Sequence, residues 1–296
     1  MKEKFRRFMN EDNVVGHVFA LPFIIGFFLI TLIPMALSLY YSFTDYRLGN
    51  PISWIGFDNY TKLFADDRFM NAIKVTFIYV LTSVPLKLVF GLFVAYLLTR
   101  NIKGTTFFRS LYYVPSLIGG SISVALVWKE IFSKTGLINV LLSKLGGEPL
   151  SWYGDQKLVM IPLVLMSVWQ FGSAMIIFAA GIKEIPKSYY EAAEMDGANK
   201  LQSFFHITLP MLSPIILYNL IMQTISAFMT FTQAYIITNG GPNDATNFYA
   251  LYVYNQAFKF NSMGYASAIS WVMLIIMGIV TLLIFKSSKS LSLIHI

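Results

Sequence analysis

The stretch Glu191–Pro210 reads EAAEMDGANKLQSFFHITLP and forms a polar island between two strongly apolar segments. Ser188 and Glu191 have the spacing of a capping box, in which the hydroxyl takes an orphan backbone N–H and the carboxylate reaches back. Pro186 keeps the preceding residue from being helical, so a helix should begin near Ser188. Gly197 suits the left-handed residue that ends a short helix. The stretch therefore predicts a helix followed by a glycine corner.

A second short helix is expected directly after this corner. Asn199 and Gln202 repeat the capping-box spacing. Pro210 lacks an N–H and suits the first turn of the membrane segment that follows. The predicted unit is thus two short helices joined at a corner and held at a membrane surface.

The spacing Glu191-Ala192-Ala193, three residues, Gly197, nine residues, Ile207, one residue, Leu209-Pro210 resembles the EAA loop of ABC importer permeases. Every consensus position is filled. The resemblance implies that this loop couples to an ATPase through Glu191, Ala192, Ala193, Asp196, Gly197, Ile207, Leu209 and Pro210. The plainer interpretation is that Glu191 only caps a helix and Gly197 only ends it. Both interpretations can hold at once, because a rigid docking element needs well-capped helices.

The composition places the chain in a membrane. Of its 296 residues 56% are hydrophobic and 12% are charged, and the mean hydropathy is +0.62. Soluble proteins carry about 25% charged residues. The net charge of +7 comes with no basic patch interleaved with aromatics on a soluble face, so no nucleic-acid partner is expected. The chain has no cysteine, which excludes disulfides and thiolate metal sites.

The apolar segments predict an all-α membrane protein with six spans, since about 20 residues cross a bilayer. The expected spans are residues 17–44, 71–99, 110–127, 158–182, 210–238 and 262–285. Residues 1–16 are expected to be a cytoplasmic tail, residues 17–285 the permease domain with its core at about 71–285 and the coupling loop at 183–210, and residues 286–296 a C-terminal tail. The resemblance implies the architecture of a type I ABC importer permease.

Lysine and arginine predict the orientation, because cytoplasmic loops carry the excess of both. Six spans put both termini on one side. That side carries twelve such residues, Lys2, Lys4, Arg6, Arg7, Arg100, Lys103, Arg109, Lys183, Lys187, Lys200, Lys286 and Lys289. The other side carries nine, Arg47, Lys62, Arg68, Lys74, Lys129, Lys134, Lys144, Lys157 and Lys259. Both termini and the polar island are therefore expected in the cytoplasm. Lys87 lies within a span, where a snorkelling side chain and a functional one are equally compatible with the sequence.

The residues for covalent chemistry are missing. The sequence has no GxxxxGK[ST] phosphate loop. Its three histidines, His17, His206 and His295, make no metal pattern. No pair of carboxylates lies inside a predicted span, which weakens a proton-coupled carrier or an intramembrane protease. We expect a chain that is not an enzyme, with no metal or cofactor of its own. The resemblance implies that partner ATPase subunits bind ATP and Mg²⁺.

Further landmarks resemble sugar-type ABC permeases. They are WIGFDNYTKLF at 54–64, FFRSLYYVPS at 107–116, Trp128-Lys129, Gly136-Leu137-Ile138-Asn139 and Thr238-Asn239-Gly240-Gly241-Pro242. The resemblance implies a subunit of an importer for a sugar or oligosaccharide in a bacterial cytoplasmic (inner) membrane. Its implied partners are a second permease, two ATPase subunits and an extracytoplasmic solute-binding protein. A self-sufficient channel or secondary carrier fits the composition as well, and a membrane-embedded enzyme has no catalytic residues to support it.

A polar stripe on the fifth span predicts a path for the solute. Its members recur at spacings of four, three, four and three, which puts them on one helical face: Asn219, Gln223, Ser226, Thr230 and Gln233. Uncharged amides and hydroxyls suit a polyhydroxylated sugar. Trp169, Gln170 and Ser173 of the fourth span are expected to contribute from across the path. The alternative is that the stripe bonds to a neighbouring helix, a contact worth about 0.6 kcal/mol in membranes.

The loop after the fifth span, residues 239–261, is the expected contact for the binding protein. It begins with a strong turn signal and is rich in aromatic residues, which supply contact area at low entropy cost. The predicted contacts are Gly240, Gly241, Pro242, Tyr249 and Tyr252. The alternative is an interfacial aromatic belt that anchors the helix ends in lipid.

Overall fold

A computed structural model describes residues 12–100 and 104–291, and all regular structure within these ranges is helical. One isolated bridge pairs Thr44 with Trp54. Residues 1–11 of the predicted tail (1–16) and the last residues, 292–296, lie outside the described part, and residues 12–16 of that tail are helical. The chain divides into two compact units, residues 1–65 with 253–272 and residues 66–252 with 273–296. The predicted all-α class is confirmed.

The first unit begins with one long helical segment, formed by α2 (Asp12–Gly26), the π-helical η1 (Phe27–Leu32) and α3 (Ile33–Ser42). Phe19–Ser42 of this segment is long and apolar enough to cross a membrane. The helical path continues through Pro22 and Pro34. It ends two residues before the predicted Thr44.

The unit continues with α4 (Asp58–Phe64), the π-helical η4 (Asn255–Lys259) and the start of α16 (Met263–Leu291). The helix before η4, α15 (Tyr249–Tyr254), belongs to the second unit except for its last two residues. Asn59 is buried and its amide donates to the carbonyls of Ser42 and Thr44 at 2.9 and 2.8 Å. Gly264 passes so close that a Cβ there would lie 2.1 Å from the Thr44 carbonyl oxygen. These contacts fix the end of α3 against the start of α16.

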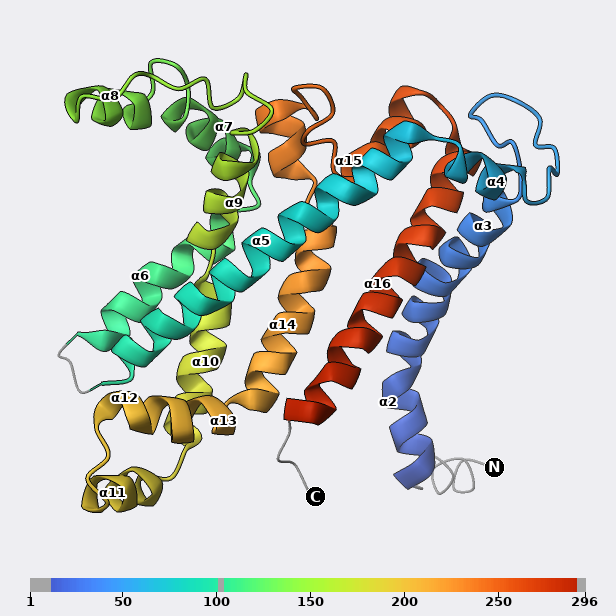
Figure 1. Cartoon of the computed structure of the whole chain (residues 1–296). Helices are drawn as coiled ribbons and strands as arrows, with labels where there is room; N and C mark the ends of the chain where they lie inside the picture. The colour runs from blue at the N-terminus through green and yellow to red at the C-terminus, as the bar shows by residue number, and fades with distance from the viewer. Residues whose placement is uncertain (1–11, 101–103, 292–296) are drawn as a thin grey trace. The chain divides into compact units, whose positions relative to one another are not determined.

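The second unit is built around α5 (Asp67–Leu98), and Figure 1 shows α9, α10 and α14 crossing it. The helix starts four residues before the predicted Asn71 because Asp66 caps it, accepting from the N–H groups of Arg68 and Phe69 at 3.0 and 3.1 Å. Gly91 marks the close packing on α10. A Cβ there would lie 3.5 Å from the backbone atoms of Phe171 and Met175.

The third predicted span is wrong as a single helix. The chain forms α6 (Thr105–Ile118) and α7 (Ile122–Ile131), which are bent by 100°. Gly119, Gly120 and Ser121 cause the break: two glycines weaken the helix and the Ser121 hydroxyl caps α7 by accepting from Val124 N–H at 3.3 Å. A short helix, α8 (Leu137–Lys144), follows.

The fourth and fifth predicted spans are also broken. The fourth is α9 (Met160–Trp169) followed by α10 (Gly172–Glu184), with a bend of 41°. The fifth is α14 (Ser213–Phe228), bent by 67° from the helical stretch Lys200–Met211. Within the described ranges, three helices are long and apolar enough to span a membrane, or up to six when each bent pair is one span. The sixth predicted span is α16, which runs beyond Phe285 into the predicted C-terminal tail.

Candidate functional site

The polar island forms a loop of two helical stretches between α10 and α14. The first is α11 (Lys187–Met195). The second runs without a break through α12 (Lys200–Ser203), the π-helical η2 (Phe204–Thr208) and α13 (Leu209–Met211). Figure 1 shows this loop beside the lower ends of α5, α6, α10 and α14. The predicted order of helix, corner and helix is confirmed.

The predicted capping box at Ser188 and Glu191 does not form. The helix begins one residue earlier than predicted, with Pro186 in the capping position and no side-chain cap. Ser188 therefore lies inside the first turn, where its hydroxyl cannot cap. Glu191 is exposed and holds no hydrogen bond or ion pair with any described residue, so its carboxylate is available to a partner.

The corner at Gly197 is as predicted. Gly197 has φ +78°, in the left-handed region that favours glycine. Its N–H donates to Glu194 O at 3.1 Å, and Ala198 N–H donates to Ala193 O at 2.8 Å. This pair of bonds is a Schellman motif, which satisfies the last carbonyls of α11.

The predicted capping box of the second helix is confirmed. The Asn199 side chain accepts from Leu201 N–H and Gln202 N–H at 3.0 and 2.9 Å, and Asn199 N–H donates to Gln202 Oε1 at 2.7 Å. Each bond satisfies a group that the helix start would otherwise leave unpaired. The direction in which α12 leaves the corner is therefore fixed locally.

Tyr190 and Thr208 tie the two halves of the loop together. Their hydroxyl oxygens lie 2.8 Å apart, and Thr208 is buried. On the far side the ring of Phe204 meets the ring of Tyr96 edge-on, with centroids 4.9 Å apart, at the end of α5. Sequence reasoning missed both contacts. Tyr190 and Thr208 are 18 residues apart on different helices, and no periodicity relates them.

The loop presents an exposed apolar surface. Met195 is 88% exposed and Leu201 is 67% exposed, with Tyr189 and Phe205 also open. Beside them lies a hollow of about 330 Å³, lined by Ala193, Asp196, Gly197, Ala198, Gln202, Ser203, His206 and Ile207. Clustered exposed apolar side chains beside a concave surface mark an interaction site. The capped corner and second helix hold this apolar surface in place, and the surface is open to contact with another protein.

The predicted coupling residues lie on both halves of the loop. Glu191, Ala192, Asp196 and Gly197 are exposed, and Ala193 is half-buried. Ile207 and Leu209 are half-buried at the second half. Pro210 lies in α13 and does not open the membrane helix as predicted, because α14 begins at Ser213 after the bend.

The predicted polar stripe is not a single helical face. Since α14 ends at Phe228, Thr230 and Gln233 follow the helix and fall outside its periodicity. Asn219, Gln223 and Ser226 remain on α14 at the predicted spacing. Asn219 is buried, its amide donates to Ile215 O at 3.2 Å, and its Oδ1 has no hydrogen-bond partner among the described residues.

The fourth-span residues pack against α6 and α7. Gln170 donates to Gly119 O at 3.3 Å and accepts from the Ser116 hydroxyl through its backbone carbonyl at 3.0 Å. Ser173 N–H donates to the same hydroxyl at 3.0 Å. The Trp169 ring lies 5.6 Å from the ring of Trp128. These contacts give all three residues a role in packing at the junction of α9 and α10.

The segment after η3 (Ala234–Thr238) makes the predicted turn. Asn239 and Gly240 have positive φ, and Thr246 Oγ1 donates to Gly241 O at 2.7 Å. Gly241 is joined to Pro242 by a cis peptide bond.

The stretch beyond this turn is not the predicted loop, because most of residues 249–259 are helical. Tyr249 and Tyr252, predicted as contacts, are both 2% exposed. Tyr249 N–H donates to Thr76 Oγ1 at 2.8 Å, and the Tyr252 hydroxyl donates to Asp66. Burial raises the pKa of the Tyr249 hydroxyl, and neighbouring Tyr252 adds to this shift. Their burial gives both tyrosines a role in holding this segment to α5.

No group of three or more His, Cys, Asp or Glu side chains that could hold a metal occurs within the described ranges. A family model for the binding-protein-dependent transport system inner membrane component matches residues 68–291. The chain belongs to this family. It is a transporter permease and not an enzyme.

Relatives and solved structures agree with this assignment. The chain is 53% identical over 290 residues to the probable ABC transporter permease protein YesP of Bacillus subtilis, covering 97% of this chain and 94% of the relative. It is 37% identical to the multiple sugar-binding transport system permease protein MsmF of Streptococcus mutans, covering 86% and 89%. A bacterial ABC transporter involved in alginate import has the same fold, with a TM-score of 0.80 at 22% identity over 97% of this chain and 99% of that one. The predicted type I permease architecture is confirmed.

Proposed function

We propose that this permease is the membrane subunit of an ATP-driven, binding-protein-dependent importer for a sugar or oligosaccharide. Family membership supports the transport role. The sugar class is supported by relatives such as MsmF and the arabinooligosaccharides transport system permease protein AraP of Bacillus subtilis, which is 32% identical over 293 residues. The chain itself performs no covalent step.

The coupling loop at residues 183–210 carries the proposal. It joins two spans, it is capped at Gly197 and Asn199, and it exposes apolar side chains beside a hollow. An ATPase groove that receives this loop would move α10 and α14 together, because the Tyr190–Thr208 contact links both ends of the loop. Closure of the ATPases would then switch the spans between outward and inward access.

The proposed assembly contains this permease, a second permease, two ATPase subunits and an extracytoplasmic solute-binding protein. One alginate importer was solved with its periplasmic protein bound to an alginate pentasaccharide, and it shares this fold with a TM-score of 0.83. ATP and Mg²⁺ are bound by the ATPase subunits. Gly241 and Pro242, which are half-buried, are proposed to contact the binding protein, while the predicted contact Gly240 is buried and, with Tyr249 and Tyr252, supports the turn from inside.

The proposed location is a bacterial cytoplasmic membrane, with both termini and the coupling loop in the cytoplasm. The excess of lysine and arginine on that side supports this orientation. A cysteine introduced at Lys200, which is exposed on α12, should react with an impermeant thiol reagent only after cells are opened. Labelling in intact cells would show that position 200 faces outward and that the topology is the reverse of the one proposed.

The solute path is proposed to run along α14, where Asn219, Gln223 and Ser226 share one face. The free Oδ1 of Asn219 supports this placement, because buried polar atoms are normally paired. Gln223→Ala should change which sugars are transported while the partner permease still co-purifies. Loss of the partner with an unchanged sugar profile would make the stripe a packing surface.

The energy source decides between this function and a self-sufficient carrier or channel. We expect sugar uptake by cells that carry the complete importer to stop when the ATPase gene is deleted, with this permease still present in the membrane. Uptake that continues without the ATPase, or that follows the proton gradient instead, would favour the carrier.

A further inference from the structure

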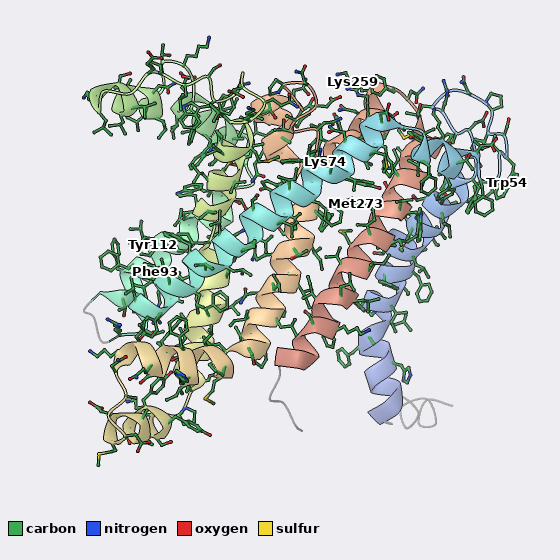
Figure 2. The ribbon with its side chains drawn as sticks, in the orientation of Figure 1. Trp54, Lys74, Phe93, Tyr112, Lys259 and Met273 are labelled. Atoms are coloured by element: carbon green, nitrogen blue, oxygen red, sulfur yellow. The ribbon has the colours of Figure 1, made fainter. Side chains whose placement is uncertain are left out.

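Lys87 lies on the packed face of α5, far from both ends of the helix. In Figure 2, Lys74 and Phe93 mark the stretch of α5 that contains it. Val80, Ser83 and Gly91 are spaced from Lys87 so that all four share one face of the helix, and these three neighbours are buried. The side chain of Lys87 thus leaves α5 toward other protein helices and not toward lipid.

This lysine has no countercharge among the described residues. Lys87 forms no hydrogen bond or ion pair with any residue of the described ranges. The helices that pack against α5 are α6, α9, α10 and α14, and their single carboxylate is Glu184 at the very end of α10. A cation at this depth is costly unless it is paired, and such residues mark sites of function.

A polar atom one turn from Lys87 is also unused. Ser83, one turn earlier on the same face, has a buried Oγ that makes no hydrogen bond of normal geometry with the described residues, although the Tyr79 hydroxyl lies nearby. Tyr79 itself, one turn further, approaches Ser167 and Thr230. The sequence Tyr79, Ser83, Lys87 makes a polar line along a helix face that is otherwise apolar.

We propose that Lys87 binds the carboxylate of an acidic sugar, a uronate unit of an oligosaccharide, as it crosses the membrane; this rests on the proposed function. A uronate supplies the missing negative charge to Lys87. One of its hydroxyls supplies the donor that Ser83 Oγ lacks. A carboxylate from the second permease would pair with Lys87 but would leave Ser83 Oγ unpaired, so it explains less of the structure.

The test uses the complete importer in proteoliposomes, with its binding protein saturated by each sugar in turn. The probes are trisaccharides of galacturonate and of mannuronate, and the same trisaccharides with their carboxyls reduced to alcohols. We expect Lys87→Met to lower uptake of the acidic trisaccharides about tenfold or more, since it removes a charge-assisted bond. Lys87→Arg should restore most of it. Lys74→Met, on the exposed face of α5, is the matched control and should change neither class.

Three results would overturn the proposal. If the wild-type importer transports the neutral trisaccharides and no uronate, the proposed sugar function stands and Lys87 does not have this role. Equal uptake of uronates by wild type and Lys87→Met does the same. Loss of the second permease from purified Lys87→Met complex would assign the countercharge to that subunit. If no sugar of either class is transported, the proposed function itself fails.

Discussion

The hydroxyl of Tyr190 lies 2.8 Å from Oγ1 of Thr208 and joins the two halves of the coupling loop. Thr208 is 1% exposed, so no water replaces this bond if it is lost. The loop therefore behaves as one body, in which a force on α11 reaches α14 without first bending the corner at Gly197.

Tyr190→Phe should loosen the loop without unfolding the protein. The change leaves the buried Thr208 hydroxyl unpaired, which costs about 1–3 kcal/mol locally. Faster amide exchange in α11 and more ATP hydrolysed per sugar imported are expected. Tyr189→Phe is the matched control, because Tyr189 is 52% exposed and its hydroxyl has no partner among the described residues. Equal exchange rates in both variants would mean that the bond does not hold the loop.

The corner at Gly197 should tolerate asparagine better than valine. Nothing lies within 4 Å of a Cβ built there, so the cost comes from φ +78° and not from a clash. Gly197→Ala should cost about 1 kcal/mol, Gly197→Asn less, and Gly197→Val more, since a β-branched residue is strained at positive φ. Sugar uptake at equal membrane content should fall in the same order. Wild-type uptake by Gly197→Val would remove the corner from the coupling mechanism.

Gly172→Ala should disrupt the packing of α10 on α6. A Cβ there would lie 2.3 Å from Tyr112 O and 2.7 Å from Tyr113 Cα, both of them backbone atoms that cannot rotate away. Figure 2 labels Tyr112 on α6. We expect a melting temperature several degrees lower in detergent. Gly120→Ala, which has open space around its Cβ, should melt like the wild type. Identical melting of the two variants would contradict the close approach.

Arg68 and Asp244 should contribute little to stability. They form a two-point ion pair with both distances at 2.9 Å, but their side chains are 57% and 32% exposed. Exposed pairs contribute about 0–1 kcal/mol and are weakened by salt. A double-mutant cycle with Arg68→Gln and Asp244→Asn should give a coupling energy in that range, smaller in high salt. A salt-independent coupling well above it would show that the pair is shielded from water.

Local signals in the sequence correctly predicted those turns and helix caps that depend only on a few neighbouring residues. Gly197, with its left-handed backbone, and the Asn199–Gln202 capping box depend only on their neighbours, and both formed as expected. The cap at Asp66 and the Gly119-Gly120 break were equally readable, but the long apolar runs around them concealed where each helix begins or ends.

Contacts between residues that are far apart in the chain could not be predicted from the sequence. Nothing in the spacing of Tyr190 and Thr208 relates them, and the end of α14 at Phe228 has no glycine or proline to mark it. Aromatic content suggested an exposed surface at Tyr249 and Tyr252, whereas packing on α5 buried both. Burial of a tyrosine depends on which helix comes to lie beside it, and composition carries no information about that.

The central claim is that the coupling loop contacts the ATPase, and site-specific photocrosslinking tests it most directly. A photoreactive amino acid at Ala192, which is exposed on α11, should form an adduct with the ATPase subunit in the assembled importer. The same group at Tyr218, 53% exposed on α14, should crosslink to lipid or to the second permease. An importer that assembles with its ATPase yet never crosslinks to it from Ala192 would contradict the account.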